Sequence, residues 1–150
     1  MKKQLSKSEI KELNRKLKEI YNIEDYFQKK EKIENIDGKI VKQGKAVFFF
    51  YGEKIIPTLK LLLKKNFLKK VVVDMGAVKF VTGGADIMRP GIVRCDPGII
   101  PDDIVVIVDE KHGKPLAVGE MIFSGAEMMT HEKGNVIKNL HHIGDKIWNS

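Results

Sequence analysis

Exposed backbone next to basic side chains is the feature of this sequence with the clearest capacity for chemistry. The stretch VVVDMGAVKFVTGGADIMRPGI, residues 71–92, contains two glycine-rich turns, Gly76-Ala77 and Gly83-Gly84-Ala85. Residues without a bulky side chain let another chain approach the backbone closely. The nearby cations are Lys79, Arg89 and Arg94. Main-chain amides and cations are groups that contact RNA phosphates, so the stretch suggests an RNA-binding site; the alternative is that the glycines only form turns.

The sequence lacks the motifs of nucleotide-binding, metal-binding and nucleophilic sites. The glycines at 76, 83 and 84 do not form the G-x-G-x-x-G pattern of a dinucleotide site, and no G-x-x-x-x-G-K-S/T loop is present. The histidines His112, His131, His141 and His142 lie at no recognised metal-ligand spacing, Cys95 stands alone, and no G-x-S-x-G motif occurs. We therefore predict no catalytic residue, no metal and no cofactor. His141 and His142 point to opposite sides of a predicted strand, so we expect one of them to form a structural hydrogen bond.

A strand, a short helix and a second strand must position the glycine-rich stretch. Residues 71–73 are predicted to form a strand, and Asp74 caps a helix from about Ala77 to Thr82 that stops at Gly83-Gly84. Further strands are predicted at 104–108, 116–123 and 136–142, with a short helix after Ser124, whose capping partner is Glu127. Short strands at this spacing indicate a small barrel.

The N-terminal part predicts one helix followed by two or three antiparallel strands. Ser6 and Glu9 have the spacing of a capping box. The apolar residues that follow at helical spacing are Ile10, Leu13, Leu17 and Ile20. Asp37-Gly38 favours a tight hairpin, and residues 46–51 are rich in strand-forming side chains. Phe48, Phe49 and Phe50 could stack on bases, but three successive residues cannot share one strand face, so a core or an interdomain seam is favoured.

A second basic cluster follows at PTLKLLLKKNFLKK, where Pro57 is predicted to open a helix. Its apolar stripe consists of Leu59, Leu62, Leu63, Phe67 and Leu68. The additional basic patch consists of Lys64, Lys65, Lys69 and Lys70. These lysines either contact phosphates or form the solvated, positively charged end of a helix.

The distribution of charge divides the chain near Lys70. The first 70 residues carry 19 basic and 9 acidic side chains, and the last 80 carry 8 basic and 11 acidic ones. A basic half suggests contact with a polyanion, although a lysine-rich surface also suits a heat-adapted protein. A single cysteine excludes an internal disulfide, and neither a secretion signal nor an apolar run long enough to span a membrane is recognised. We expect a cytoplasmic protein without a membrane partner.

Residues 71–148 resemble the PUA domain, the RNA-binding module named for pseudouridine synthases and archaeosine transglycosylases. The resemblance rests on residues 71–92, on AVGEMIFSGAEM and on GNVIKNLHHIGDKIW. The positions that match the family pattern are Asp74, Gly76-Ala77, Gly84-Ala85, Pro90-Gly91-Ile92, Gly119, and His142-x-Gly144-Asp145. Upstream, VFFFYGEKIIPTLKLLLKKNFLKK resembles the family of the eukaryotic malignant-T-cell-amplified-sequence protein and the N-terminal part of ligatin, translation initiation factor 2D. The lysine-rich composition is compatible with an archaeal relative.

The resemblance implies a fold and a binding surface. The fold class is an α+β N-terminal domain, residues 1–70, followed by a mostly-β PUA pseudobarrel of six strands, residues 71–150. The implied RNA-binding residues are Gly76, Ala77, Lys79, Phe80, Gly84, Ala85, Asp86, Ile87, Met88 and Arg89. Lys79 and Arg89 would contact phosphates, and the Gly84-Ala85 backbone would contact the sugar-phosphate chain. Asp86 would lie in a turn or strand, or accept a hydrogen bond from a base edge. Of Ile87 and Met88, Met88 is the one expected in the core.

The resemblance also implies a function. PUA domains of modification enzymes accompany a large catalytic domain, which about 70 upstream residues cannot supply, so we expect no enzyme. The implied function is RNA binding in the translation apparatus, to tRNA or small-subunit rRNA of the ribosome. One alternative is a protein-interaction subunit that docks an initiation-factor-like partner through residues 47–51. Another is an accessory subunit that guides a separate RNA-modifying enzyme.

Overall fold

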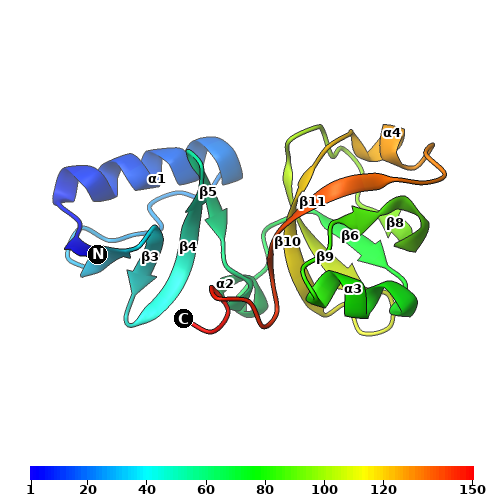
Figure 1. The fold of residues 1–150 in the computed structure, drawn as a ribbon. Coiled ribbons are helices and arrows are strands. Elements are labelled where there is room, and N and C mark those ends of the chain that lie inside the picture. The colour runs from blue at the N-terminus through cyan, green and yellow to red at the C-terminus, as the bar shows by residue number, and fades with distance from the viewer.

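Two β-sheets lie side by side in the computed structural model, which describes residues 1–150 (Figure 1). The first sheet is antiparallel and follows chain order. Its strands are β1 (Lys2–Gln4), β2 (Ile33–Ile36), β3 (Lys39–Lys42), β4 (Lys45–Tyr51) and β5 (Lys54–Pro57). It has more strands than the two or three predicted, because β1 is a three-residue polar segment without a strand-like pattern.

Helix α1 (Lys7–Tyr21) lies across the first sheet (Figure 1). The capping box is confirmed, since the Ser6 hydroxyl accepts a hydrogen bond from the Glu9 N–H and the Glu9 carboxylate accepts one from the Ser6 N–H. Its apolar stripe buries Ile10, Leu13 and Leu17. The prediction was wrong for Ile20, which lies in the last turn and is 49% exposed. None of the helices is long and apolar enough to cross a membrane.

The turn between β2 and β3 is the predicted hairpin. Asp37 and Gly38 have φ angles of 53° and 84°, the left-handed values that a two-residue turn of this kind requires. On β4, Phe48 is fully buried under α1, and Phe49 is buried on the side toward the second sheet. The aromatic run therefore divides between a core and a seam, as predicted.

Helix α2 (Leu59–Lys64) connects the two sheets and is shorter than predicted. Thr58 caps it through a hydrogen bond that its hydroxyl accepts from the Leu61 N–H. Pro57 is the last residue of β5 rather than the first of the helix. Leu63 is 49% exposed, so the predicted apolar stripe is incomplete on this helix.

The second sheet contains six strands in the order β7-β11-β10-β9-β6-β8. They are β6 (Lys70–Val73), β7 (Ile87–Met88), β8 (Ile92–Cys95), β9 (Ile104–Asp109), β10 (Pro115–Met121) and β11 (Asn135–His142). All neighbours are antiparallel except β6 and β9. The edge strands β7 and β8 are joined by the three-residue turn η2 (Arg89–Gly91), so the sheet must curl until its edges approach each other.

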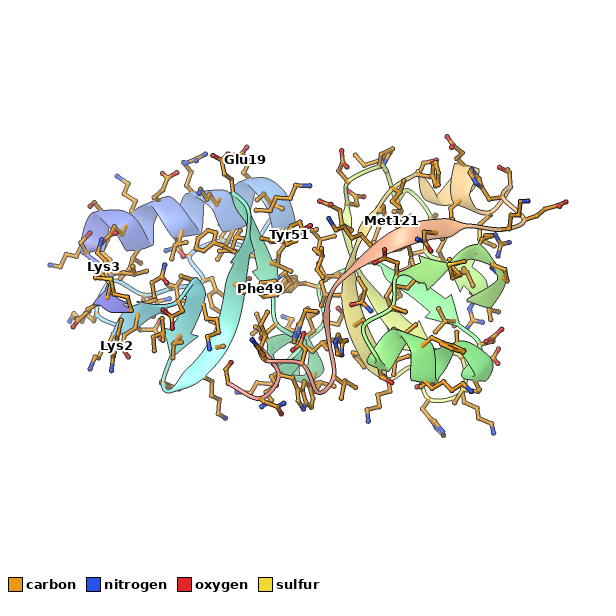
Figure 2. All side chains as sticks on the ribbon, in the orientation of Figure 1. Lys2, Lys3, Glu19, Phe49, Tyr51 and Met121 are labelled. Carbon is orange, nitrogen blue, oxygen red and sulfur yellow. The ribbon has the colours of Figure 1, made fainter.

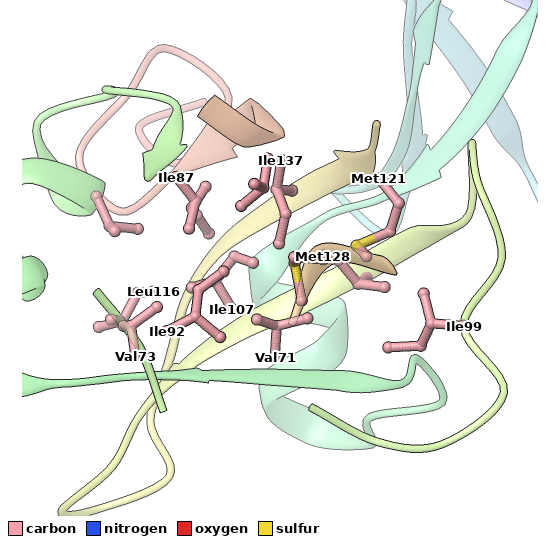
Figure 3. Packing of buried hydrophobic residues seen from close by; sticks show 14 residues of the cluster. Val71, Val73, Ile87, Ile92, Ile99, Ile107, Leu116, Met121, Met128 and Ile137 are labelled. Carbon is pink, nitrogen blue, oxygen red and sulfur yellow. The ribbon is translucent and has the colours of Figure 1, made fainter. Parts of the chain in front are cut away.

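Three short helical segments and one hydrophobic core complete this half. The segments are η1 (Met75–Ala77), α3 (Val78–Thr82) and α4 (Gly125–Met128). Figure 3 shows branched aliphatic side chains and two methionines, Met121 and Met128, packed inside the curled sheet. This core fixes the strands that carry the glycine-rich stretch.

A hydrophobic seam joins the two halves. It contains Phe49 and Ile56 from the first sheet, Leu59 and Leu62 from α2, and valines from the second sheet. Figure 2 shows Phe49 and Tyr51 directed toward the second half. The edge of the seam is polar: the Lys54 ammonium pairs with the Glu120 carboxylate, and the Lys138 ammonium lies 4.9 Å from the Tyr51 ring centroid.

His141 is the buried polar residue of the seam. Its Nε2 accepts a hydrogen bond from the Leu59 N–H at 3.1 Å, and its Nδ1 lies 2.8 Å from the Asp145 carboxylate. Nδ1 therefore carries the proton. Burial lowers the pKa of His141 despite the nearby carboxylate. Burial alone would raise the pKa of Asp145, but hydrogen bonds from the Trp148 N–H and from His141 and His142 hold it below its usual range. The structure thus contains a neutral imidazole and an ionised carboxylate.

The state of His141 predicts how stability depends on pH. The unfolded chain binds a proton at His141 below about pH 6.5, whereas the folded chain resists it. We expect the free energy of unfolding, measured with denaturant, to fall as the pH is lowered from about 7 to about 5. His141→Ala should lose about 1–3 kcal/mol near pH 7, because it leaves the Leu59 N–H without an acceptor, and should flatten this pH dependence. His112→Ala, in an exposed turn, is the control and should keep the pH dependence of the unaltered protein. If His141→Ala shows the same pH dependence as the unaltered protein, His141 is not the group responsible.

Candidate nucleic-acid interface

Asp74 starts the glycine-rich segment where β6 ends. Its carboxylate accepts a hydrogen bond from the Ala77 N–H at 2.9 Å, and its own N–H donates to the Gly91 carbonyl at 2.9 Å. The first bond starts η1, which continues directly into α3, and the second ties this start to η2. The predicted cap is confirmed, although the first turn is a 3-10 turn. Gly76 is exposed and Ala77 half-buried beside this cap.

Helix α3 presents a cation and an aromatic ring to solvent. Val81 is buried against the core, whereas Lys79 is exposed and Phe80 is 60% exposed. The Lys79 ammonium lies 5.1 Å from the Phe80 ring centroid and forms no ion pair with a carboxylate. A large exposed aromatic residue beside an unpaired lysine offers both stacking and charge to a nucleic acid.

The loop after α3 is held by Asn139 on β11. The Asn139 amide Nδ2 donates to the carbonyls of Val81 and Ala85, at 3.0 and 2.9 Å. The Asn139 main-chain N–H donates to one oxygen of the Asp86 carboxylate at 3.0 Å. Asp86 therefore anchors the loop through one oxygen while its side chain remains exposed. These three hydrogen bonds fix the backbone around Gly84 before any ligand arrives.

Gly84 packs directly against His142. Gly84 has a φ of +94°, and a Cβ built there would lie 2.9 Å from the His142 Nε2. The His142 Nδ1 lies 2.9 Å from the Ile143 carbonyl, to which it donates a hydrogen bond. The half-buried imidazole thus lies beside the loop backbone, a contact that the sequence analysis missed. No local pattern reveals it, because 57 residues separate the two positions.

The two residues of β7 face opposite ways. Ile87 is 2% exposed and belongs to the core, whereas Met88 is 50% exposed. The assignment of Met88 to the core was wrong, and Ile87 is not available for contact with a base. Both residues are apolar, so the alternation of a strand could not be read from their chemistry.

Arg89 is engaged within the protein. Its Nη1 donates to the Ile92 carbonyl at 3.1 Å and its Nη2 to the Met129 carbonyl at 3.4 Å, while its Nε is buried without a partner. The guanidinium connects η2 with the end of α4 and is not a free cation for a phosphate. Arg94, on β8, is exposed.

Two lysines of the additional basic patch line different grooves. Lys64, Lys65, Lys69 and Lys70 are all exposed. However, Lys64 lines a groove beside Trp148, whereas Lys69 lines a different groove beside Tyr21 and donates to the Gly98 carbonyl at 3.1 Å.

Residues 47–51 are not a free docking surface. Val47, Phe48 and Phe49 are 9%, 0% and 5% exposed, and Phe50 is half-buried. Tyr51 is 36% exposed and carries the Lys138 ammonium over its ring. The proposed partner surface on this run is therefore corrected: the run already packs against α1 and the second sheet.

The lone thiol has the character of a protonated, poorly nucleophilic group. Burial and the nearby Asp96 carboxylate raise the pKa of Cys95, and Arg89 opposes this only in part. No three side chains of the kinds that bind metals meet at one place.

The contact between Gly84 and His142 predicts a difference between two matched substitutions. Gly84 and Gly134 share a φ of +94°, but nothing lies within 4 Å of a Cβ built at Gly134. Both alanine variants should lose about 1–2 kcal/mol of unfolding free energy from backbone strain. Gly84→Ala should lose more, because its methyl group meets the imidazole. Adding His142→Ala should remove this excess in a double-mutant cycle; equal losses in both glycine variants would refute the contact.

Comparison with known proteins places this geometry in a family. An uncharacterized protein of Methanocaldococcus jannaschii is 45% identical, covering 97% of this chain and 93% of its own. The translation machinery-associated protein 20 of Saccharomyces cerevisiae is 37% identical, and the match covers 85% of this chain and 77% of that protein. The crystal structure of a hypothetical protein of Pyrococcus horikoshii superposes with a TM-score of 0.82 at 34% identity, covering 99% and 98%.

A more distant match is a chain of an H/ACA ribonucleoprotein bound to a substrate RNA, with a TM-score of 0.52 at 30% identity, covering 64% of this chain and 29% of that one. The PUA domain family itself matches residues 69–143, which include the whole of the candidate interface. The chain therefore belongs to the PUA domain family, among relatives that include translation machinery-associated protein 20 and malignant T-cell-amplified sequence 1.

Proposed function

We propose that this protein is a non-catalytic RNA-binding protein of the translation apparatus, which contacts tRNA or small-subunit rRNA through α3 and the loop that follows it. The observation that carries the proposal is the exposed pair of Lys79 and Phe80 beside the fixed backbone at Gly84. A cation, a ring and an accessible main chain are the three groups that bind unpaired or terminal nucleotides.

The relatives support the same function. A yeast relative is named for its association with the translation machinery, and a chain of similar fold belongs to a ribonucleoprotein bound to RNA. The curled six-stranded sheet would be the pseudobarrel of the PUA type, with residues 1–70 as a separate N-terminal domain. Function then consists of positioning RNA, with no chemical step.

Each exposed residue of the interface has a distinct role in this proposal. Lys79 contacts a phosphate, and Phe80 stacks on a base. The Gly84-Ala85 backbone lies against the sugar-phosphate chain. Asp86 uses the oxygen not bound to Asn139 to accept a hydrogen bond from a base edge, and Met88 makes apolar contact.

A protein partner of the initiation-factor type remains compatible with RNA binding, but it would have to dock away from the buried run 47–51. A pull-down from nuclease-treated extract tests this partner. A protein that stays bound after RNA is removed would support direct docking, and one that is released would show attachment through RNA.

Substitutions on α3 test the proposed interface. Lys79→Ala should weaken binding to the target RNA and reduce the slope of log affinity against log salt by about 0.7–0.9. Phe80→Ala should cost about 1–3 kcal/mol of binding free energy with a smaller change in slope. Lys30→Ala, an exposed lysine before the first hairpin, is the control for general charge.

The RNA itself should be identified by crosslinking in cell extract followed by sequencing. We expect tRNA or small-subunit rRNA to be enriched with the unaltered protein and with Lys30→Ala, and to be lost in the Lys79→Ala/Phe80→Ala variant. Equal RNA recovery from all three proteins would remove α3 from the binding site.

A further inference from the structure

A groove separate from the α3 face lies between the start of β4, helix α2 and the C-terminal segment. It has a volume of about 360 Å³, a size typical of sites for small molecules. Figure 1 shows the C-terminal segment beside α2, between the two sheets, whereas α3 lies on the far half of the molecule. No residue of α3 or of the loop that follows it lines this groove, whereas Lys64 of the additional basic patch does.

The charged side chains that line the groove are all lysines. Lys60 and Lys64 lie one turn apart on α2, and Lys45 comes from β4. None of the three pairs with a carboxylate, although Lys2, Lys3, Lys18, Lys42 and Lys54 each do. Ammonium groups that share a groove repel each other, and a bound anion relieves this repulsion.

The groove also offers an aromatic surface. Trp148 lines it, and the Lys60 ammonium lies 5.1 Å from its ring centroid. Leu63, which lines the same groove, is 49% exposed. An indole and an aliphatic side chain next to lysines suit a ligand with a flat ring and a phosphate.

Hydrogen bonds hold the walls of the groove in place. The main-chain N–H of Trp148 donates to the Asp145 carboxylate at 2.8 Å, and the same carboxylate accepts a hydrogen bond from His141, which is buried in the groove lining. On the other side, the Thr58 hydroxyl donates to the Ala46 carbonyl at 2.9 Å. The groove is therefore preorganised, which lowers the cost of ordering side chains when a ligand binds.

We propose that this groove binds a nucleotide unit, with its phosphate held by Lys45, Lys60 and Lys64 and its base against Trp148. The ligand is either a free nucleotide or an end of a single-stranded RNA, since both present the same base and phosphate. The groove is separate from the α3 face, so an experiment that refutes nucleotide binding in the groove leaves the proposed function untouched.

Trp148 is the one tryptophan of the chain, so its fluorescence reports on this groove alone. The probes are AMP, ribose 5-phosphate and a single-stranded RNA hexanucleotide. AMP should quench the fluorescence through contact between the base and the indole. Ribose 5-phosphate should compete with AMP without quenching. If no probe changes the fluorescence and calorimetry detects no binding, the proposal is overturned.

Matched lysine variants test the phosphate contacts. Lys60→Gln/Lys64→Gln should weaken AMP binding by about tenfold or more, because a single charge-assisted contact is worth roughly that factor. Lys45→Gln tests the same contact from β4, without any change in α2. Lys65→Gln/Lys69→Gln removes the same charge outside the groove and should leave the affinity unchanged. Equal weakening in both double variants would show general charge attraction and overturn the site.

The same titrations distinguish the two sources of the ligand. Similar affinities for AMP and the hexanucleotide would identify a free nucleotide, and a hexanucleotide that binds at least about tenfold more tightly would identify an RNA end. Lys79→Ala/Phe80→Ala should keep the full quenching by AMP. Loss of quenching in that variant would place AMP on the α3 face and refute a separate site.

Discussion

One buried imidazole ties together the parts of this protein. His141 accepts the N–H of Leu59 at the start of α2 and faces Asp145, whose carboxylate also accepts the N–H groups of His142 and Trp148. It can do so only as a neutral ring with its proton on Nδ1, because a charged ring would present a second donor to the Leu59 N–H. The apolar seam around it excludes water, and the same exclusion lowers its pKa.

The next residue along β11 connects this seam with the candidate RNA interface. Adjacent residues of a strand point to opposite faces, so when His141 enters the seam, His142 is directed toward Gly84. A shift of β11 by one residue would remove both contacts together. Asn139 lies three residues before His142, and an irregularity in the pairing of β10 with β11 between them lets its side chain also reach the loop, where it binds Val81 and Ala85. The strand that closes the seam therefore also fixes the backbone of the candidate interface.

Local signals in the sequence predicted local structure well. The capping box at Ser6, the Asp37-Gly38 turn and the Asp74 cap each depend on residues within a few positions of one another, and each is confirmed. At the candidate site, the errors concern which way a side chain points or which distant group it meets. Ile87 and Met88 are both apolar, so the sequence could not show that Ile87 is the buried residue and Met88 the exposed one. One hydrogen-bond partner of Arg89, the Met129 carbonyl, lies forty residues away in the sequence. Such contacts are set by tertiary packing.

Under the proposed function, the charges of the two halves give each half a different part in binding RNA. The second half carries more acidic than basic side chains, so it would contribute specific contacts such as Lys79 and Phe80 and little general attraction. The lysines of the first half would supply the long-range attraction that speeds encounter with a polyanion. Relative motion is the usual expectation for two units joined by a polar interface. Here the seam is apolar and His141 accepts a hydrogen bond from Leu59 across it, so we expect the first half to keep a fixed orientation to the candidate interface.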